Sequence, residues 1–274
     1  MMSEIVVFTD LDGTLLDLDD YSYQAALPAV RYLQEQGIPI VFCSSKTRTE
    51  QEVYRRELSI GDPFIVENGG AILIPQGYFW HSFKYQRVAG GYQIIELGAV
   101  YSEIRQALEK IRSVSGLCFR GWGDMTPEEL AAVIWLDVAA AERAKVREYS
   151  ETLLLEGDAE DIKRVQHLVE GAGLTFTAGS RFHTVTASSD KGKAVNTLTD
   201  IFREERGEII TIGLGDSFND IPMLERVAIP VLVQRPGGIW TEITLPRLQR
   251  VRGIGPEGWA RAIREVIPGL ISKT

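Results

Sequence analysis

The feature that most limits the folds open to this 274-residue chain is the order of its predicted apolar strands and amphipathic helices. Near the N-terminus, strands are predicted over residues 5–8, 38–43 and 63–66, and helices over residues 25–36 and 47–58. Near the C-terminus the alternation returns, with strands predicted over residues 208–214 and 231–233 and helices over residues 193–202, 220–227 and 257–266. Alternation of this kind is typical of a doubly wound parallel sheet with helices on both faces.

The middle of the chain has a different rhythm. Thr126 and Glu129 form a capping box before one predicted helix, which ends near Trp135. Other helices are predicted to include residues 100–111, 139–150 and 159–170, and strands are predicted over residues 152–156 and on both sides of Gly179 within residues 174–187. We therefore expect an α/β, Rossmann-like core domain made of residues 1–82 and 190–274, with an inserted α+β module over residues 83–189.

Composition excludes several classes of partner. The net charge of −9 and the pI near 5.0 argue against nucleic acid, because phosphate backbones require basic surfaces. A small anionic substrate remains compatible, since local lysines and arginines can bind it. We predict no membrane partner and no secretory leader, because Glu4 and Asp10 interrupt the first apolar run. Cys43 and Cys118 are too few for a disulfide framework and favour a reducing, cytoplasmic location. The oligomeric state stays open.

Acidic residues follow two of the predicted core strands. Asp10 and Asp12 come after the strand over residues 5–8, and Asp216 comes after the strand over residues 208–214. Asp220 begins the next predicted helix. Carboxyl ends of parallel strands carry the ligand sites of doubly wound sheets, and grouped carboxylates suit Mg²⁺. The alternative is that Asp10 and Asp12 form a turn and that Asp220 is an ordinary N-cap.

Two further residues fit a phosphate site. Ser44 ends a predicted strand and can donate a hydrogen bond to a phosphoryl oxygen, or it can cap the following helix. Lys191 begins a core helix and can neutralise phosphate charge beside Asp10, although a lysine at such a position is usually on the surface. The combination favours phosphoryl transfer.

These motifs resemble those of the haloacid dehalogenase superfamily of phosphatases. The four ordered segments are Asp10-Leu11-Asp12-Gly13-Thr14, Ser44, Lys191-Gly192 and Gly215-Asp216-x-x-Asn219-Asp220. The resemblance implies that Asp10 is the nucleophile that forms an aspartyl-phosphate and that Asp12 acts as general acid and then base. It also implies Mg²⁺ binding by the Asp10 carboxylate, the Asp12 carbonyl and Asp216, with support from Asp220. The inserted module resembles the superfamily's C2-type cap.

Further segments resemble mannosyl-3-phosphoglycerate phosphatases. They are Cys43-Ser44-Ser45-Lys46-Thr47-Arg48, Glu67-Asn68-Gly69-Gly70-Ala71, Gly123-Asp124-Met125-Thr126, Ala144-Lys145-x-Arg147-Glu148-Tyr149-x-Glu151, Gly179-Ser180-Arg181-Phe182-His183 and Asp190-Lys191-Gly192-Lys193-Ala194-Val195. The resemblance implies phosphate release from mannosyl-3-phosphoglycerate to give mannosylglycerate, a compatible solute. Thr152 and residues 184–189 depart from the family pattern, so glucosyl-3-phosphoglycerate or another sugar phosphate stays an alternative substrate.

Substrate-binding candidates lie in both domains. They are Ser45, Lys46, Arg48, Asn68, Arg147, Arg181 and Asn219. Arg181 can hold the glycerate carboxylate with two hydrogen bonds. Lys46 and Arg48 can instead be exposed residues at a helix start, and Arg147 can pair with Glu151 along a charged helix face. We expect His183 to be a packing residue rather than a ligand. For Trp80, Trp122 and Trp135 we expect packing in the core or the cap, with stacking on sugar rings as the alternative.

Two other functions would use the same core domain. A phosphomutase would have the same core, with a cap that retains the phosphorylated intermediate. A sugar-phosphate sensor would have the same fold without turnover, but the intact carboxylates and lysine disfavour it because a sensor does not require a nucleophile.

Overall fold

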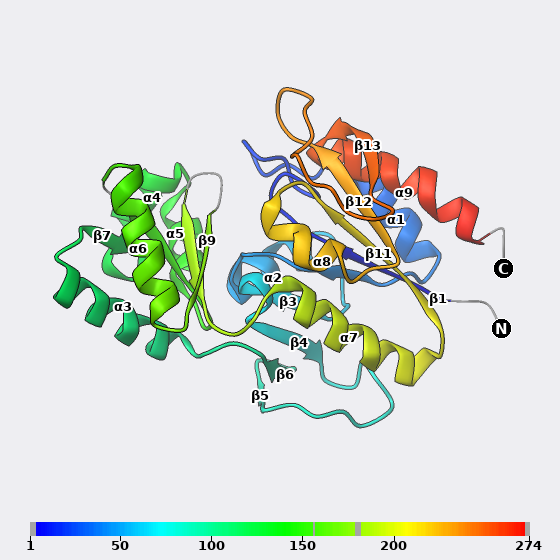
Figure 1. Ribbon diagram of the computed structural model, residues 1–274. Helices are drawn as coiled ribbons and strands as arrows, with labels where there is room; N and C mark the ends of the chain where they lie inside the picture. Colours follow the sequence, from blue (N-terminus) through cyan, green and yellow to red (C-terminus); the bar gives the residue numbers. More distant parts are fainter. Residues whose placement is uncertain (1–3, 156, 179–181, 272–274) are drawn as a thin grey trace.

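The computed structural model describes residues 4–155, 157–178 and 182–271 and has two lobes (Figure 1). The larger lobe contains a five-stranded parallel sheet with the order β13-β12-β11-β1-β2. Its strands are β1 (Glu4–Thr9), β2 (Ile40–Phe42), β11 (Ile209–Gly215), β12 (Ile229–Gln234) and β13 (Gln249–Ile254). The central pair, β1 and β11, is made of one segment from each end of the chain, as predicted for a discontinuous core.

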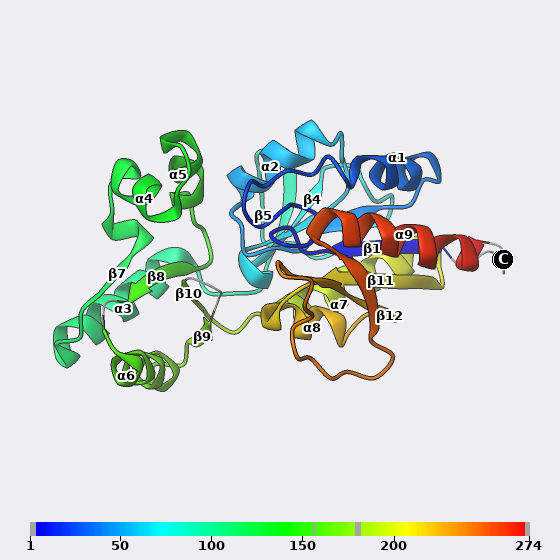
Figure 2. The same ribbon diagram turned by 90° about the horizontal axis from the view of Figure 1, so that it is seen from above.

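Helices cover both faces of this sheet. On one face lie α1 (Leu27–Glu35), α2 (Arg48–Glu57) and α9 (Gly255–Ile271), and on the other lie α7 (Lys191–Arg206) and the short α8 (Ile221–Leu224) (Figure 2). Alternate residues of β1 supply the two cores, with Val7 packed beside α1 and α9, and Val6 and Phe8 packed beside α7. The predicted doubly wound α/β core is confirmed.

A second sheet extends the core beyond β2. Its strands, in the order β3-β4-β6-β5, are β3 (Phe64–Val66), β4 (Ala71–Pro75), β6 (Tyr92–Glu96) and β5 (Arg87–Ala89), and all pairings are antiparallel. A parallel bridge between Cys43 and Ile65 joins it to the main sheet. Because β6 pairs with β4 of the core and β5 pairs with β6, we propose that the inserted module begins close to Leu97 rather than at residue 83.

The smaller lobe is the inserted α+β module. An antiparallel sheet in the order β7-β8-β10-β9 comprises β7 (Phe119–Gly121), β8 (Glu151–Leu155), β10 (His183–Thr186) and β9 (Thr175–Ala178). Its helices are α3 (Tyr101–Ser115), α4 (Pro127–Ile134), α5 (Val138–Lys145) and α6 (Ala159–Gly171). Side chains of α3 and α6 pack on this sheet to form a separate core, around Ile104, Leu108 and Val165.

Three sequence predictions differ from the structure. The helix predicted over residues 139–150 ends at Lys145, and Glu151 already opens β8. The helix predicted over residues 220–227 is a 3-10 turn (Phe218–Asp220) followed by the four-residue α8. Strand β13 was not predicted, because alternating arginines leave it without an apolar run. Within the described part of the chain, no helix has the length and apolarity needed to cross a membrane.

Candidate active site

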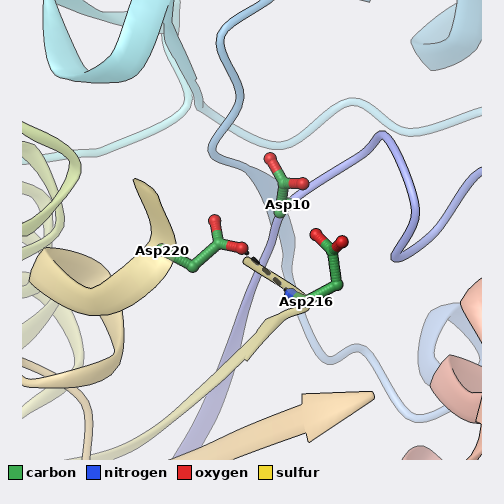
Figure 3. Close-up of side chains that lie close together, drawn as sticks. All are labelled: Asp10, Asp216 and Asp220. Atoms are coloured by element: carbon green, nitrogen blue, oxygen red, sulfur yellow. Dashed lines mark hydrogen bonds between the residues drawn. The ribbon is translucent and has the colours of Figure 1, made fainter. Parts of the chain in front are cut away.

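Three buried carboxylates meet where β1 and β11 end (Figure 3). The parallel register places Thr9 beside Leu214, and the Asp10 amide donates to the Leu214 carbonyl over 2.9 Å. Asp10 and Asp216 therefore leave the sheet side by side. One oxygen each of Asp10, Asp216 and Asp220 can be chosen so that all lie within 4.8 Å of one another. The predicted convergence of acidic strand ends is confirmed.

Lys191 joins this cluster from the N-terminus of α7. Its Nζ atom lies 2.6 Å from Asp10 Oδ1 and 2.7 Å from Asp220 Oδ1, and the side chain is 1% exposed. The alternative of a surface lysine is therefore wrong. Asp190 fixes the start of α7 by accepting a hydrogen bond from the Lys193 amide over 2.8 Å.

Burial controls the charges of the cluster. It raises the pKa of Asp10 well above its usual value, an effect that Asp220 strengthens and Lys191 opposes. Burial and then Asp220 raise the pKa of Asp216 to about 7. Burial alone would lower the pKa of Lys191, but the nearby Asp10 and Asp220 outweigh it and raise that pKa. Lys191 is thus a permanent cation at neutral pH.

The backbone around Asp216 sets the orientation of the carboxylates. Asp220 Oδ2 accepts hydrogen bonds from the amides of Asp216 and Ser217, at 3.0 and 3.1 Å. Asp220 directly precedes α8 but its side chain makes no capping hydrogen bond to that helix, so the alternative of an ordinary N-cap is wrong. Gly13 has a φ of +78°, and a Cβ atom there would lie 2.9 Å from Asp216 Oδ2. Only glycine allows the first loop to approach Asp216 so closely.

The donor set of this cluster fits a hard divalent cation. Asp216 and Asp10 present buried carboxylate oxygens, and one oxygen of each lies near a cation, Arg235 and Lys191 respectively. Both oxygens of Asp220 accept hydrogen bonds, from Lys191 and from backbone amides. Asp10 and Asp216 are therefore the side chains best placed to bind a metal, and Asp220 is placed to orient them. Haloacid dehalogenase-like phosphatases generally use Mg²⁺.

The Asp12 carboxylate lies outside this three-carboxylate cluster. Its Oδ1 atom is 2.9 Å from Lys46 Nζ. Lys46 is 8% exposed and also lies over the Tyr21 ring, 4.6 Å from its centroid. Burial would lower the pKa of Lys46, but Asp12 and Glu50 outweigh burial and raise it. The alternative of an exposed lysine at a helix start is therefore wrong, and the buried Lys46 pairs with Asp12, whose side chain is 30% exposed.

Ser44 is buried at the end of β2 and does not cap α2. Its hydroxyl accepts a hydrogen bond from the Lys46 amide over 3.3 Å. Thr47 is the N-cap of α2, in a capping box with Glu50, so the alternative of an N-cap role for Ser44 is wrong. The turn from Ser44 to Lys46 instead runs beside Asp12.

Two predicted substrate-binding arginines contact protein groups. Arg147 is 7% exposed, and its NH2 atom donates to the Ser45 carbonyl over 3.0 Å and to Ser150 Oγ over 2.8 Å. The alternative that Arg147 pairs with Glu151 along a helix face is wrong, because residues 146–150 are not helical and Glu151 pairs with Arg105 at 2.9 Å. Arg48 Nε lies 3.5 Å from a Glu148 oxygen.

The remaining candidates have varied settings. Asn68 is buried with a φ of 56°, and its Oδ1 has no hydrogen-bond partner among the described residues. Asn219 accepts a hydrogen bond from Ser217 Oγ over 2.6 Å. Arg181 lies outside the described residues, as do Gly179 and Ser180.

The aromatic candidates divide between packing and exposure. His183 stacks on Phe176 with ring centroids 4.9 Å apart, and burial lowers its pKa, as expected for a packing histidine. Trp122 packs edge-to-face against Phe182, in line with the packing expectation. Trp80 and Trp135 are 97% and 79% exposed, so core packing is wrong for both.

Sequence reasoning missed two residues at the site. Arg235 Nε lies 3.3 Å from Asp216 Oδ2, and Arg235 directly follows β12, the next strand of the same sheet edge. Its position after a predicted strand is the signal that could have found it. The other is Trp259, whose indole N–H donates to Thr9 Oγ1 over 2.9 Å, while that hydroxyl donates to the Asp10 carbonyl. The pattern of α9 gives no sign of this contact.

Comparisons with known proteins agree with this site. A family of haloacid dehalogenase-like hydrolases matches residues 7–235. A "glucosyl-3-phosphoglycerate/mannosyl-3-phosphoglycerate phosphatase" of Methanococcoides burtonii is 47% identical over 96% of this chain and 97% of its own. A "mannosyl-3-phosphoglycerate phosphatase" of Pyrococcus horikoshii is 43% identical over 81% of this chain and 87% of its own.

A solved structure supports the fold independently. The crystal structure of protein 0175 of Thermoplasma acidophilum superposes with a TM-score of 0.67 at 19% identity and covers 97% of this chain and 98% of its own. At that identity the likeness concerns the fold alone. With the carboxylate cluster, the buried lysine and the family match together, the chain belongs to the haloacid dehalogenase-like hydrolases.

Proposed function

We propose that this protein is a Mg²⁺-dependent phosphatase that releases phosphate from mannosyl-3-phosphoglycerate and from glucosyl-3-phosphoglycerate. The observation that carries the chemistry is the buried Lys191 between Asp10 and Asp220, with Asp216 beside them. The substrate class rests on the printed names of the relatives that match over most of the chain, one of which includes both sugars.

The proposed reaction has two steps. In the first, an Asp10 carboxylate oxygen bonds to phosphorus while the bond from phosphorus to the glycerate oxygen breaks, and Asp12 gives its proton to that leaving oxygen. In the second, Asp12 takes a proton from water, the water oxygen bonds to phosphorus, and the bond from phosphorus to Asp10 breaks. Phosphate leaves and both aspartates return to their starting states.

The surrounding residues prepare Asp10 for this role. Lys191 favours the ionised carboxylate, against the burial and the neighbouring acids that oppose ionisation. Asp10 and Asp216 would hold Mg²⁺, which when bound supplies positive charge that offsets the charge of the phosphoryl group. The Asp12 carbonyl would complete the protein ligands, and Ser44 would donate its hydroxyl to a phosphoryl oxygen.

Recognition of the glycerate and sugar is proposed for the face between the two lobes. Ser45, Asn68, Asn219, Arg181 and Lys46 stay substrate-binding proposals. The contacts of Arg48 with Glu148 and of Arg147 with Ser45 each join a core residue to a residue of the inserted module, which favours a role in holding the lobes together.

The test is phosphate release across a panel of substrates. Purified protein with Mg²⁺ is given mannosyl- and glucosyl-3-phosphoglycerate, 3-phosphoglycerate and hexose phosphates, and kcat/KM is compared. We expect the two glycosyl-phosphoglycerates to be the best substrates, and we expect Asp10→Asn to abolish release while Asp19→Asn, in an exposed loop, leaves it unchanged. Phosphate transfer within the substrate would indicate a phosphomutase, and binding without turnover would indicate a sensor. Retained turnover after chelation of Mg²⁺ would contradict the metal assignment.

A further inference from the structure

A strained turn follows β3 at the junction between the lobes. Three successive residues have positive φ angles: Glu67 at 51°, Asn68 at 56° and Gly69 at 94°. Left-handed backbone costs a residue other than glycine about 1–2 kcal/mol, so two such residues in succession persist only where surrounding contacts determine the conformation. Glu67 is 0% exposed, and Asn68 is 9% exposed.

Among the described residues, all hydrogen-bond partners of the Glu67 carboxylate lie in the inserted module. Its Oε1 accepts from the Glu148 amide over 2.8 Å, and its Oε2 accepts from the Tyr149 amide over 3.0 Å and from Ser150 Oγ over 2.6 Å. Arg147 Nε lies 3.7 Å from Oε2 and provides the opposite charge. The segment from Arg147 to Ser150 is thus held by one carboxylate of the core.

The backbone of the same turn contacts the proposed phosphate site. The Glu67 amide donates to the Lys46 carbonyl over 3.1 Å, and the Asn68 amide donates to the Ser44 carbonyl over 2.9 Å. A Cβ atom on Gly69 would lie 2.1 Å from the carbonyl oxygen of Asp190, the residue before Lys191. The turn therefore contacts residues 44–46, here called the Ser44 loop, as well as the start of α7 and the inserted module.

Other contacts attach the same part of the module to the core. The hydroxyls of Thr47 and Thr49 both donate to the Arg143 carbonyl at the end of α5, over 3.0 and 2.9 Å. Arg147 donates to the Ser45 carbonyl, as described above. Residues 143–150 thus form an attachment between the lobes that is separate from the two connecting segments at residues 97–98 and 187–190.

We infer that Glu67 is a positioning residue for the reaction: its carboxylate sets the inserted module relative to the Ser44 loop, so that a large substrate is aligned on Asp10. This inference rests on the proposed function. It predicts that the Glu67 side chain matters for substrates that contact both lobes and has little effect on a small substrate that contacts the core alone. The backbone of the turn, by contrast, supports the Ser44 loop for every substrate.

The experiment compares Glu67→Gln with Glu35→Gln, an exposed glutamate at the end of α1. Glutamine keeps the shape but turns an NH2 group toward backbone N–H donors, so at least one hydrogen bond to a charged acceptor is lost. Such a loss corresponds to about a tenfold to hundredfold fall in kcat/KM for glycosyl-3-phosphoglycerate. For p-nitrophenyl phosphate we expect Glu67→Gln and the wild type to agree, and Glu35→Gln to match the wild type on both substrates.

A second measurement does not depend on activity. Amide hydrogen exchange at Glu148 and Tyr149 should be faster in Glu67→Gln than in the wild type, also by about a factor of ten or more. Unchanged exchange, or an equal fall in kcat/KM for both substrates, would overturn the inference. If the wild type cleaves p-nitrophenyl phosphate but no glycosyl-phosphoglycerate, the proposed substrate fails, and the exchange rates still decide the role of Glu67.

Discussion

Replacing Lys191 by methionine tests the electrostatic account of the site most directly. Methionine has a similar length but no charge, so Asp10 and Asp220 lose the cation that lies 2.6 and 2.7 Å from them. Both carboxylates are then buried beside Asp216 with no comparable neutralisation. The variant should lose phosphatase activity and, independently, a large part of its stability.

The size of the stability loss follows from burial. Lys191 is 1% exposed and Asp220 is 0% exposed, so water does not screen the pair. Removing one partner of a buried ion pair typically costs about 3–5 kcal/mol. For a chain of this size that corresponds to a fall in Tm of about 6–20 °C. The folded pKa of Lys191 is raised above its unfolded value, so the titration of Lys191 itself leaves this contribution intact below about pH 10.4 and removes it as pH rises further.

The assay is urea unfolding near neutral pH, with Lys163→Met on the exposed face of α6 as the control. The control should change the free energy of unfolding by less than about 0.5 kcal/mol. The difference in free energy of unfolding between the wild type and Lys191→Met should become smaller toward about pH 5, because the uncompensated carboxylates of the variant then take up protons. If Lys191→Met lowers the free energy of unfolding by less than about 1 kcal/mol, or if its difference from the wild type does not depend on pH, the argument that Lys191 compensates buried charge is refuted.

Two further predictions concern the turn at Gly69 and the inserted module. Gly69→Ala and Gly77→Ala both place alanine at a positive φ, which costs about 1–2 kcal/mol. Only at Gly69 does the new Cβ meet backbone, at Asp190, so we expect about 1–3 kcal/mol more destabilisation there by chemical unfolding; equal losses would contradict the close contact. Burial raises the pKa of Asp124, but hydrogen bonds led by Arg105 outweigh burial and lower that pKa to about 2. Because the folded pKa is depressed, the stability that Asp124 adds is present above about pH 3.8 and is lost as pH falls toward about 2. The wild type should therefore exceed Asp124→Asn in unfolding free energy at about pH 6 and lose that advantage in acid, and a difference that grows in acid would contradict this sign.

The arrangement of the carboxylates in the candidate site was predictable because it depends on chain direction. Parallel strands end at the same edge of a sheet, so acidic residues directly after two such strands must lie near each other wherever those strands are neighbours. Asp10 and Asp216 meet this condition, since β1 and β11 pair in register. Arg235 follows the next strand of that edge and could have been found by the same rule.

The end of α5 was not predictable from neighbouring residues. The pattern of residues 139–150 is that of a charged helix, with Arg147 and Glu151 four positions apart. In the structure the amide of Glu148 donates instead to Glu67, 81 positions away in the chain. A contact between such distant residues has no signature in local periodicity.

The sequence by itself determined the discontinuous α/β core, the family and the acidic residues of the site, because these follow from strand patterns and from motifs in a definite order. Only the tertiary structure decided the partners of the basic residues. Lys46 is buried against Asp12, and Arg147 is buried against Ser45 and Ser150, although both side chains also suit an exposed helix face. The physical reason is that a long cationic side chain can reach acceptors on several elements, so its partner depends on how those elements pack.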